Sequence, residues 1–94
     1  MALKVKFVGA LRHISGKTQL SVNTQEAATV QQLVETLSRQ IPELSHTLRS
    51  QELNDPRSNT LILVNGREIS VLGGYEAQLE DGDEVVFIPV VHGG

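Results

Sequence analysis

Apolar and polar residues alternate along the N-terminal segment with the period of a β-strand. The stretch LKVKFV places lysines between three apolar residues that we expect to point inward: Leu3, Val5 and Phe7. Val8 falls on the lysine side of this strand and is expected to face outward. After a turn at Ser15-Gly16, the stretch KTQLSV resumes the alternation more weakly. Residues 2–22 are therefore predicted to form an antiparallel hairpin whose loop is longer than the tightest type.

The period changes from strand to helix after Thr29. Thr29 followed by Gln32 has the spacing of a capping box, in which two side chains satisfy the free N–H groups of a helix start. Apolar residues then recur at helical spacing as far as Pro42, namely Val30, Leu33, Val34, Leu37 and Ile41. This pattern predicts a helix of about three turns with one apolar face.

Residues 43–59 carry a weaker pattern. Leu44 and Leu48 have the spacing of a short helical turn. Asn54-Asp55-Pro56 is typical of a loop. The pattern therefore indicates a short helical turn at Leu44 and Leu48 and a loop at residues 54–56, and leaves the rest of this segment open.

The C-terminal third reads as a hairpin followed by a final strand. TLILV is a strand-like apolar run, Asn65-Gly66 is the dipeptide most typical of a two-residue hairpin loop, and REISV is the predicted partner strand. We interpret Gly73-Gly74 as a flexible connection between strands. A turn at Asp81-Gly82 then precedes a last strand over residues 84–91.

The order of these elements predicts an α+β fold. In so small a chain, a helix lying across one face of a mixed sheet buries its apolar stripe most simply. We expect a β-grasp (ubiquitin-like) architecture, with four to five strands, one main helix, and the first and last strands as central neighbours. Two helices on a plain antiparallel sheet are the alternative that periodicity leaves open.

Composition excludes several classes of function. The chain has 94 residues, which is the size of a single domain spanning 1–94. Its net charge of −3 and its 3% aromatic content do not support direct nucleic-acid binding. Cysteine is absent, which removes disulfides and thiolate chemistry. No stretch has the length or composition of a signal peptide or a membrane span, so we expect a cytoplasmic protein that does not bind membranes.

Conventional catalytic and metal sites are not indicated. The histidines His13, His46 and His92 lie at spacings that place no two on one helical face, and we interpret them as isolated surface residues. The acidic residues around Gly82 lack the alternating ligands of a calcium loop, and we interpret them as a solvated turn that helps to dock a basic partner. No nucleophile elbow or phosphate loop is present. We predict a protein that is not itself an enzyme and holds no metal or cofactor.

The last strand is apolar on both faces. If Val85 and Phe87 point inward, three other side chains point outward: Val86, Ile88 and Val90. Val8 on the neighbouring first strand would join them, forming an apolar patch typical of a docking surface. The alternative is that both faces are covered, for example by a dimer.

The C-terminal residues have the character of a reactive tail. Glycine has no Cβ and fits a narrow channel, so Gly93-Gly94 can enter another protein's active site. Residues 91–94, when extended, would reach roughly 13 Å beyond the fold. A carboxylate must be activated before a nucleophile can displace its oxygen, and adenylation with ATP and Mg²⁺ on a partner enzyme achieves this.

Three motifs together resemble a known family. KVKF followed by LR, VNG in the middle hairpin, and EDGDEVVFIPVVHGG at the end are similar to the ubiquitin-like sulfur carriers. These include the molybdopterin synthase small subunit, the thiazole sulfur carrier, the ubiquitin-related modifiers and the small archaeal modifier proteins. The resemblance implies a β-grasp fold whose terminal glycine is adenylated by a ubiquitin-activating-type enzyme and converted to a thiocarboxylate.

The same resemblance assigns roles to individual residues. Gly94 would carry the adenylate and then the thiocarboxylate, and Gly93 would keep the approach through the channel unhindered. Ile88, Val8 and Arg12 match the family's surface for the activating enzyme. His92, where the molybdopterin branch often has a small residue, is more like the ubiquitin-related modifiers.

The resemblance also implies further partners. These are the large subunit of molybdopterin synthase or a tRNA-thiolating enzyme. Two alternative functions stay open beside the sulfur carrier: a protein modifier conjugated through Gly94 to lysines of target proteins, and a non-covalent interaction module.

Overall fold

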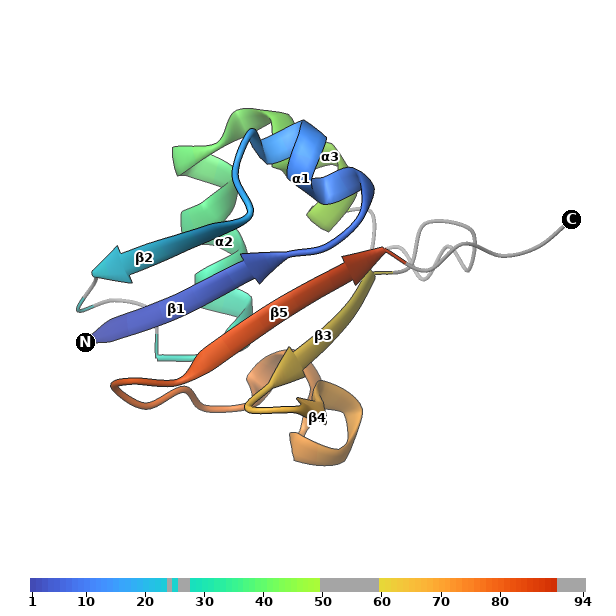
Figure 1. The fold of residues 1–94 in the computed structure, drawn as a ribbon. Coiled ribbons are helices and arrows are strands. Elements are labelled where there is room, and N and C mark those ends of the chain that lie inside the picture. Colours follow the sequence, from blue (N-terminus) through green and yellow to red (C-terminus); the bar gives the residue numbers. More distant parts are fainter. Residues whose placement is uncertain (24, 26–27, 50–59, 90–94) are drawn as a thin grey trace, which may run out of the picture.

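The computed structural model describes residues 1–23, 25, 28–49 and 60–89. Its central feature is a mixed sheet of five strands in the order β2-β1-β5-β3-β4. The strands are β1 (Ala2–Phe7), β2 (Gln19–Asn23), β3 (Thr60–Val64), β4 (Arg67–Glu68) and β5 (Glu84–Pro89). β1 and β5 run parallel at the centre, and the other neighbours are antiparallel (Figure 1). The predicted β-grasp fold is confirmed, and the plain antiparallel sheet is wrong.

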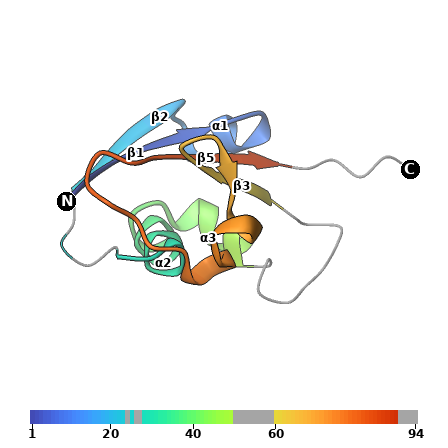
Figure 2. The same cartoon turned by 90° about the horizontal axis from the view of Figure 1, so that it is seen from below.

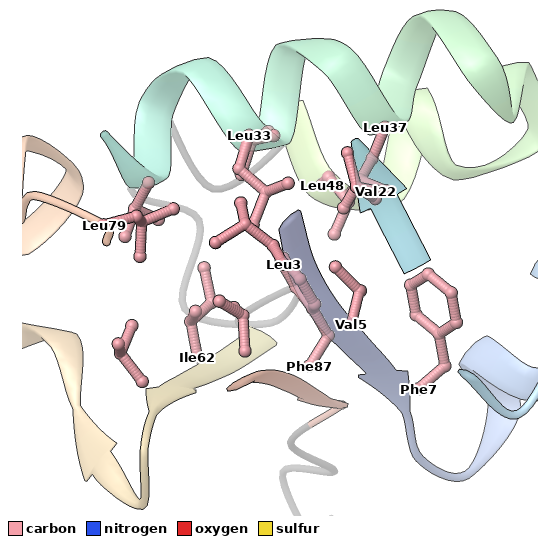
Figure 3. Close-up of a cluster of buried hydrophobic side chains, with 14 of the residues drawn as sticks. Leu3, Val5, Phe7, Val22, Leu33, Leu37, Leu48, Ile62, Leu79 and Phe87 are labelled. Atoms are coloured by element: carbon pink, nitrogen blue, oxygen red, sulfur yellow. The ribbon is translucent and has the colours of Figure 1, made fainter. Parts of the chain in front are cut away.

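On β1 and β5, the side chains that point into the core are the ones that the apolar–polar alternation predicts. The side chains of Leu3, Val5 and Phe7 on β1 are at most 2% exposed, as are those of Val85 and Phe87 on β5. The rings of Phe7 and Phe87 pack with their centroids 6.0 Å apart. Figure 3 shows Leu3, Val5 and Phe7 on the side of the sheet that faces Leu33 and Leu37 of the helical layer. Burying each such side chain contributes roughly 1.5–3 kcal/mol.

Two helices cover one face of the sheet (Figure 2). Helix α2 (Val30–Gln40) begins with the predicted capping box, because Gln32 N–H donates to the Thr29 hydroxyl while the Gln32 side chain accepts from Thr29 N–H. Helix α3 (Pro42–Arg49) follows at once, with Leu44 and Leu48 buried. The sequence predicts a single turn here, whereas the structure has an eight-residue helix.

The connection between β1 and β2 contains a helix that the sequence does not predict. Helix α1 (Ala10–Ser15) contributes a single fully buried side chain, Leu11, so the segment is too short to display a helical period. It ends at Gly16, whose left-handed conformation lets its N–H bond to the Arg12 carbonyl. β1 and β2 nevertheless pair antiparallel, as predicted.

The hairpin after β3 is shorter than predicted. Asn65 and Gly66 have φ values of 51° and 85°, the positive values that a type I′ loop requires. Of REISV, only Arg67–Glu68 pairs as a strand. The Glu68 carboxylate accepts a hydrogen bond from Ser70 N–H and so caps the 3₁₀ helix η3 (Ile69–Leu72), which ends the strand. A second 3₁₀ helix, η4 (Gly74–Glu76), follows. Gly73-Gly74 therefore belongs to a folded turn and not to a free connection.

The acidic turn before β5 is a structural element. Asp81 accepts a hydrogen bond from Ala2 N–H at 2.6 Å, and Asp83 accepts from Glu80 N–H at 2.8 Å and from the Asn65 amide at 2.9 Å. These contacts join the start of β1, the hairpin loop and the start of β5. Two of the carboxylates predicted to be solvated thus fix the turn.

Removing the cap of α2 should destabilise the protein without changing its fold. Thr29→Ala deletes the hydroxyl that accepts from Gln32 N–H, and loss of an N-cap costs about 1 kcal/mol. We expect that decrease in the free energy of unfolding, measured by urea denaturation. Thr29→Ser, which keeps the hydroxyl, is the matched control, and an equal loss in both variants would contradict the capping role.

Glu68 should make stability depend on pH. Hydrogen bonds from the Ser70 hydroxyl and then from its backbone N–H lower the pKa of the Glu68 carboxyl below its ordinary value. The ionised Glu68 carboxylate stabilises the folded state fully at pH values above the ordinary glutamate pKa. This stabilisation is lost as the pH falls through the lowered pKa of Glu68. An NMR titration of the Glu68 side chain should show the low pKa. Ser70→Ala should raise it towards the ordinary value, and an unchanged pKa would refute this origin.

Candidate functional site

The candidate site begins where β5 leaves the sheet. β5 ends at Pro89, between the end of β1 on one side and Thr60 at the start of β3 on the other. Val8 N–H extends the parallel ladder by donating to the Phe87 carbonyl at 3.0 Å. Val90, His92, Gly93 and Gly94 lie outside the described residues, so their predicted roles remain predictions.

The loop after β1 packs against this exit point. Gly9 has φ of 62°, and a Cβ built on it would lie 3.2 Å from Pro89 Cγ. Side chains larger than glycine would therefore meet both backbone strain and the proline ring. The loop and the last described residue of β5 thus hold each other in place.

Arg12 is tied to the end of β1. It lies on α1 and is exposed, and its Nε donates to the Phe7 carbonyl at 3.2 Å. This bond holds the base of the guanidinium at the end of the strand, while the rest of the guanidinium stays available to a partner.

The outward face of the sheet carries the predicted apolar patch. Val86 and Ile88 are half-buried and alternate with the buried Val85 and Phe87, as the sequence predicts. Val8 is also half-buried and continues the outward-facing side of β1. The structure therefore brings the described members of the predicted docking surface to one side of the molecule.

Two further members of this patch are missing from the sequence prediction. Leu63 pairs with Val86 and Leu61 pairs with Ile88, and both leucines are half-buried. The five side chains of Val8, Leu61, Leu63, Val86 and Ile88 form what we call the outer patch. The run TLILV contains the signal, because every second residue of a strand buried on one face must point to the other. Only the pairing of β3 with β5 places those residues beside Ile88.

Charged residues border the outer patch along β1. Lys6 lies opposite Val86, and its ammonium forms an ion pair with Glu84 at 3.2 Å. Both side chains are about two-fifths exposed, at 42% and 39%, so the pair contributes little to stability. Lys4, next along the same face, is exposed. The patch thus has an aliphatic centre and a mixed-charge border, an arrangement typical of a protein interface.

The two described histidines lie on different helices. His13 lies on α1 and His46 on α3, and both are exposed. Within the described ranges no three histidine or acidic side chains are grouped in a way that could hold a metal. In the same ranges, none of the helices has the length and apolar character needed to span a bilayer.

Comparison with known proteins shows to which family this chain belongs. The chain is 31% identical over its whole length to small archaeal modifier protein 3 of Haloferax volcanii, and 30% identical to ubiquitin-related modifier 1 of Schizosaccharomyces pombe; the alignments cover 100% of each protein. Its fold superposes on small archaeal modifier protein 1 of Methanosarcina acetivorans with a TM-score of 0.80 at 28% identity, covering 99% of this chain and 96% of the other. The family model of the ThiS family matches residues 5–94. The chain belongs to the ThiS family.

Proposed function

We propose that this chain is a sulfur carrier whose Gly94 carboxylate is activated on a partner enzyme. The observation that carries the proposal is the match of the family model as far as residue 94, so that it includes the Gly-Gly sequence itself. The fixed exit of β5 and the outward patch beside it support the same reading. In this proposal the chain is a co-substrate and not an enzyme.

The chemistry divides between the carrier and its partners. A ubiquitin-activating-type enzyme with Mg²⁺ would join the Gly94 carboxylate to the α-phosphate of ATP and release pyrophosphate. A persulfide sulfur would then displace AMP and form a C–S bond, and a second thiol would cleave the S–S bond to leave the thiocarboxylate. This chain has no cysteine, so the sulfur and both thiols come from partners. Because adenylation uses ATP, we propose that the chain acts in the cytoplasm.

The outer patch serves in this proposal as the docking surface for the activating enzyme. The activating enzyme would bury the side chains of Val8, Val86 and Ile88. The Arg12 guanidinium would pair with an acidic group of that enzyme. Val90 and His92 would continue this contact towards the active site, while Gly93 leaves the channel unobstructed. Docking and reaction are thereby separated between a rigid sheet and the last residues of the chain.

Conjugation to proteins is the second function that we propose. It is favoured by the two relatives named modifiers, both of which align with this chain over its full length. The same Gly94 adenylate, or an ester formed from it, would react with a lysine amine of a target protein to give an isopeptide bond. Activation is common to both functions, and they differ only in the nucleophile that accepts the acyl group or its sulfur.

Loss of the two terminal glycines should abolish both functions and leave the fold intact. Deleting Gly93-Gly94 removes the proposed acyl donor, and the loss of two residues at a chain end generally costs a domain little stability. We expect no oxygen-to-sulfur exchange by intact mass after incubation with ATP, the activating enzyme and a persulfide donor, and an unchanged thermal unfolding midpoint. Gly73→Ala, in the internal Gly-Gly pair, is the control for glycine loss elsewhere. It should leave the sulfur exchange intact, although alanine is strained at the φ of 103° of Gly73 and should lower the unfolding midpoint. Full cellular function of the deletion would favour a non-covalent interaction module.

The acceptor can be identified with the same thiocarboxylated protein. We propose a pterin precursor, with the large subunit of a molybdopterin synthase, or a tRNA uridine, with a thiolating enzyme, as the alternatives. Transfer of labelled sulfur to one of these would assign the pathway. Labelled protein–protein conjugates would assign the modifier role.

A charge in the outer patch should weaken activation at the docking step. Ile88→Lys places an ammonium where an aliphatic side chain would be buried, and losing about 1.5–3 kcal/mol of burial corresponds to a roughly 10- to 100-fold rise in KM for the carrier. The matched control is Val71→Lys, because Val71 is 74% exposed and lies on η3, away from the patch. A change in kcat alone, or equal effects in both variants, would argue against docking through the patch.

A further inference from the structure

Among the described strands, β2 forms one edge of the sheet. It pairs with β1 on one side, and in both views it is the outermost strand on its other side (Figures 1 and 2). Exposed edges usually carry lysine, proline, a bulge or a very short strand, which discourage pairing with another chain. The opposite edge follows this rule, since β4 has two residues. β2 has five residues, QLSVN, which include no charge and no proline, and its register with β1 runs without interruption.

The direction of each backbone group on β2 follows from the bonds of its neighbour. Phe7 N–H donates to the Thr18 carbonyl at 3.0 Å, so the antiparallel alternation directs Thr18, Leu20 and Val22 towards β1. Lys4 and Val8 instead donate to the β5 side, which agrees with this alternation. The N–H and C=O groups of Gln19, Ser21 and Asn23 therefore point away from the sheet, at the open edge.

We propose that this edge pairs with the β2 strand of a second copy, antiparallel about a twofold axis at Ser21. In that register Ser21 faces Ser21 of the other copy, and Gln19 faces Asn23. All three outward N–H groups of each copy then reach outward carbonyls, giving six hydrogen bonds in the two-residue repeat of an antiparallel ladder. A register displaced along the strand would leave some of these groups unpaired.

The side chains of β2 are self-complementary in the same register. Along β2 the side chains are a carboxamide, an aliphatic group, a hydroxyl, an aliphatic group and a carboxamide. In an antiparallel pair of two β2 strands, each side chain therefore lies opposite one of the same chemical type. Gln19 and Asn23 are exposed on the outward face and can pair through their amides. On the helix side, the half-buried Leu20 meets Val22 of the other copy at a non-hydrogen-bonded position, where side chains are closest.

Electrostatic repulsion does not oppose the pairing at close range. Among the described residues, the nearest like charges on the outward face are Lys4 of each copy, opposite Ser21 on β1. They would lie three strand spacings apart, about 14 Å, beyond the screening length of about 8 Å at physiological ionic strength. A twofold axis normal to the sheet keeps both outer patches on one face of a ten-stranded sheet. The dimer would thus present two copies of the docking surface, and its existence does not depend on the proposed function.

A single cysteine at the twofold axis tests the geometry. Facing Cα atoms in a hydrogen-bonded pair are about 5.5 Å apart, within the range that a disulfide spans. Since the chain has no cysteine, Ser21→Cys should give a covalent dimer rapidly under mild oxidant. Val71→Cys, at an exposed position on η3, is the matched control and should cross-link only slowly.

The unmodified chain provides the second measurement. Its sedimentation coefficient should rise between micromolar and millimolar concentration, and amide exchange at Gln19, Ser21 and Asn23 should slow. Ser21→Lys places two ammonium groups across the axis without touching the bonds to β1, and should remain monomeric with an unchanged unfolding midpoint at low concentration. Ser21→Thr should still dimerise. A monomer at every concentration, equal cross-linking of the two cysteine variants, or a dimer that persists in Ser21→Lys would overturn the proposal.

Discussion

The parallel pairing of β1 with β5 is the constraint on which the rest of the structure depends. It joins the first and last strands of the chain at the centre of the sheet and stacks Phe7 against Phe87 beneath the helices. Parallel strands cannot be joined by a tight turn, so the intervening chain must cross over, and here the crossover supplies the whole helical layer. Both central strands are buried on that side, while their other side is left to face outward.

This arrangement also brings the end of β1 next to the end of β5. Because β1 and β5 run in the same direction, the loop that follows β1 lies next to the point where β5 ends. Gly9 packs against Pro89, and Arg12 is tied to the end of β1. The last described residue of β5 is therefore held in place next to the aliphatic outer patch. The proposed carrier role fits this arrangement, since a partner that acts on the chain end must also recognise the body of the protein.

The two edge strands of the sheet, β4 and β2, differ in how many backbone groups they leave available for pairing. At the β4 edge the Glu68 carboxylate caps the next turn, so the strand ends after two residues. At the β2 edge the backbone groups of Gln19, Ser21 and Asn23 remain directed outward. β2 has no charge and no proline, so this edge stays open to the matching strand that we propose.

The sequence by itself determined the elements that have a sustained local period: the inward face of β1, the capped helix α2 and the outward direction of Ile88. The Gly-Gly end and its proposed reactivity can also be read from the residues alone. Only the tertiary structure decided which distant residues meet. Leu61 and Leu63 join the outer patch through the pairing of β3 with β5, and Asp81 accepts a hydrogen bond from Ala2, 79 positions away in the chain. Local patterns report which way a side chain points, whereas the partner that it meets depends on strand order, which is set by burial of the whole core.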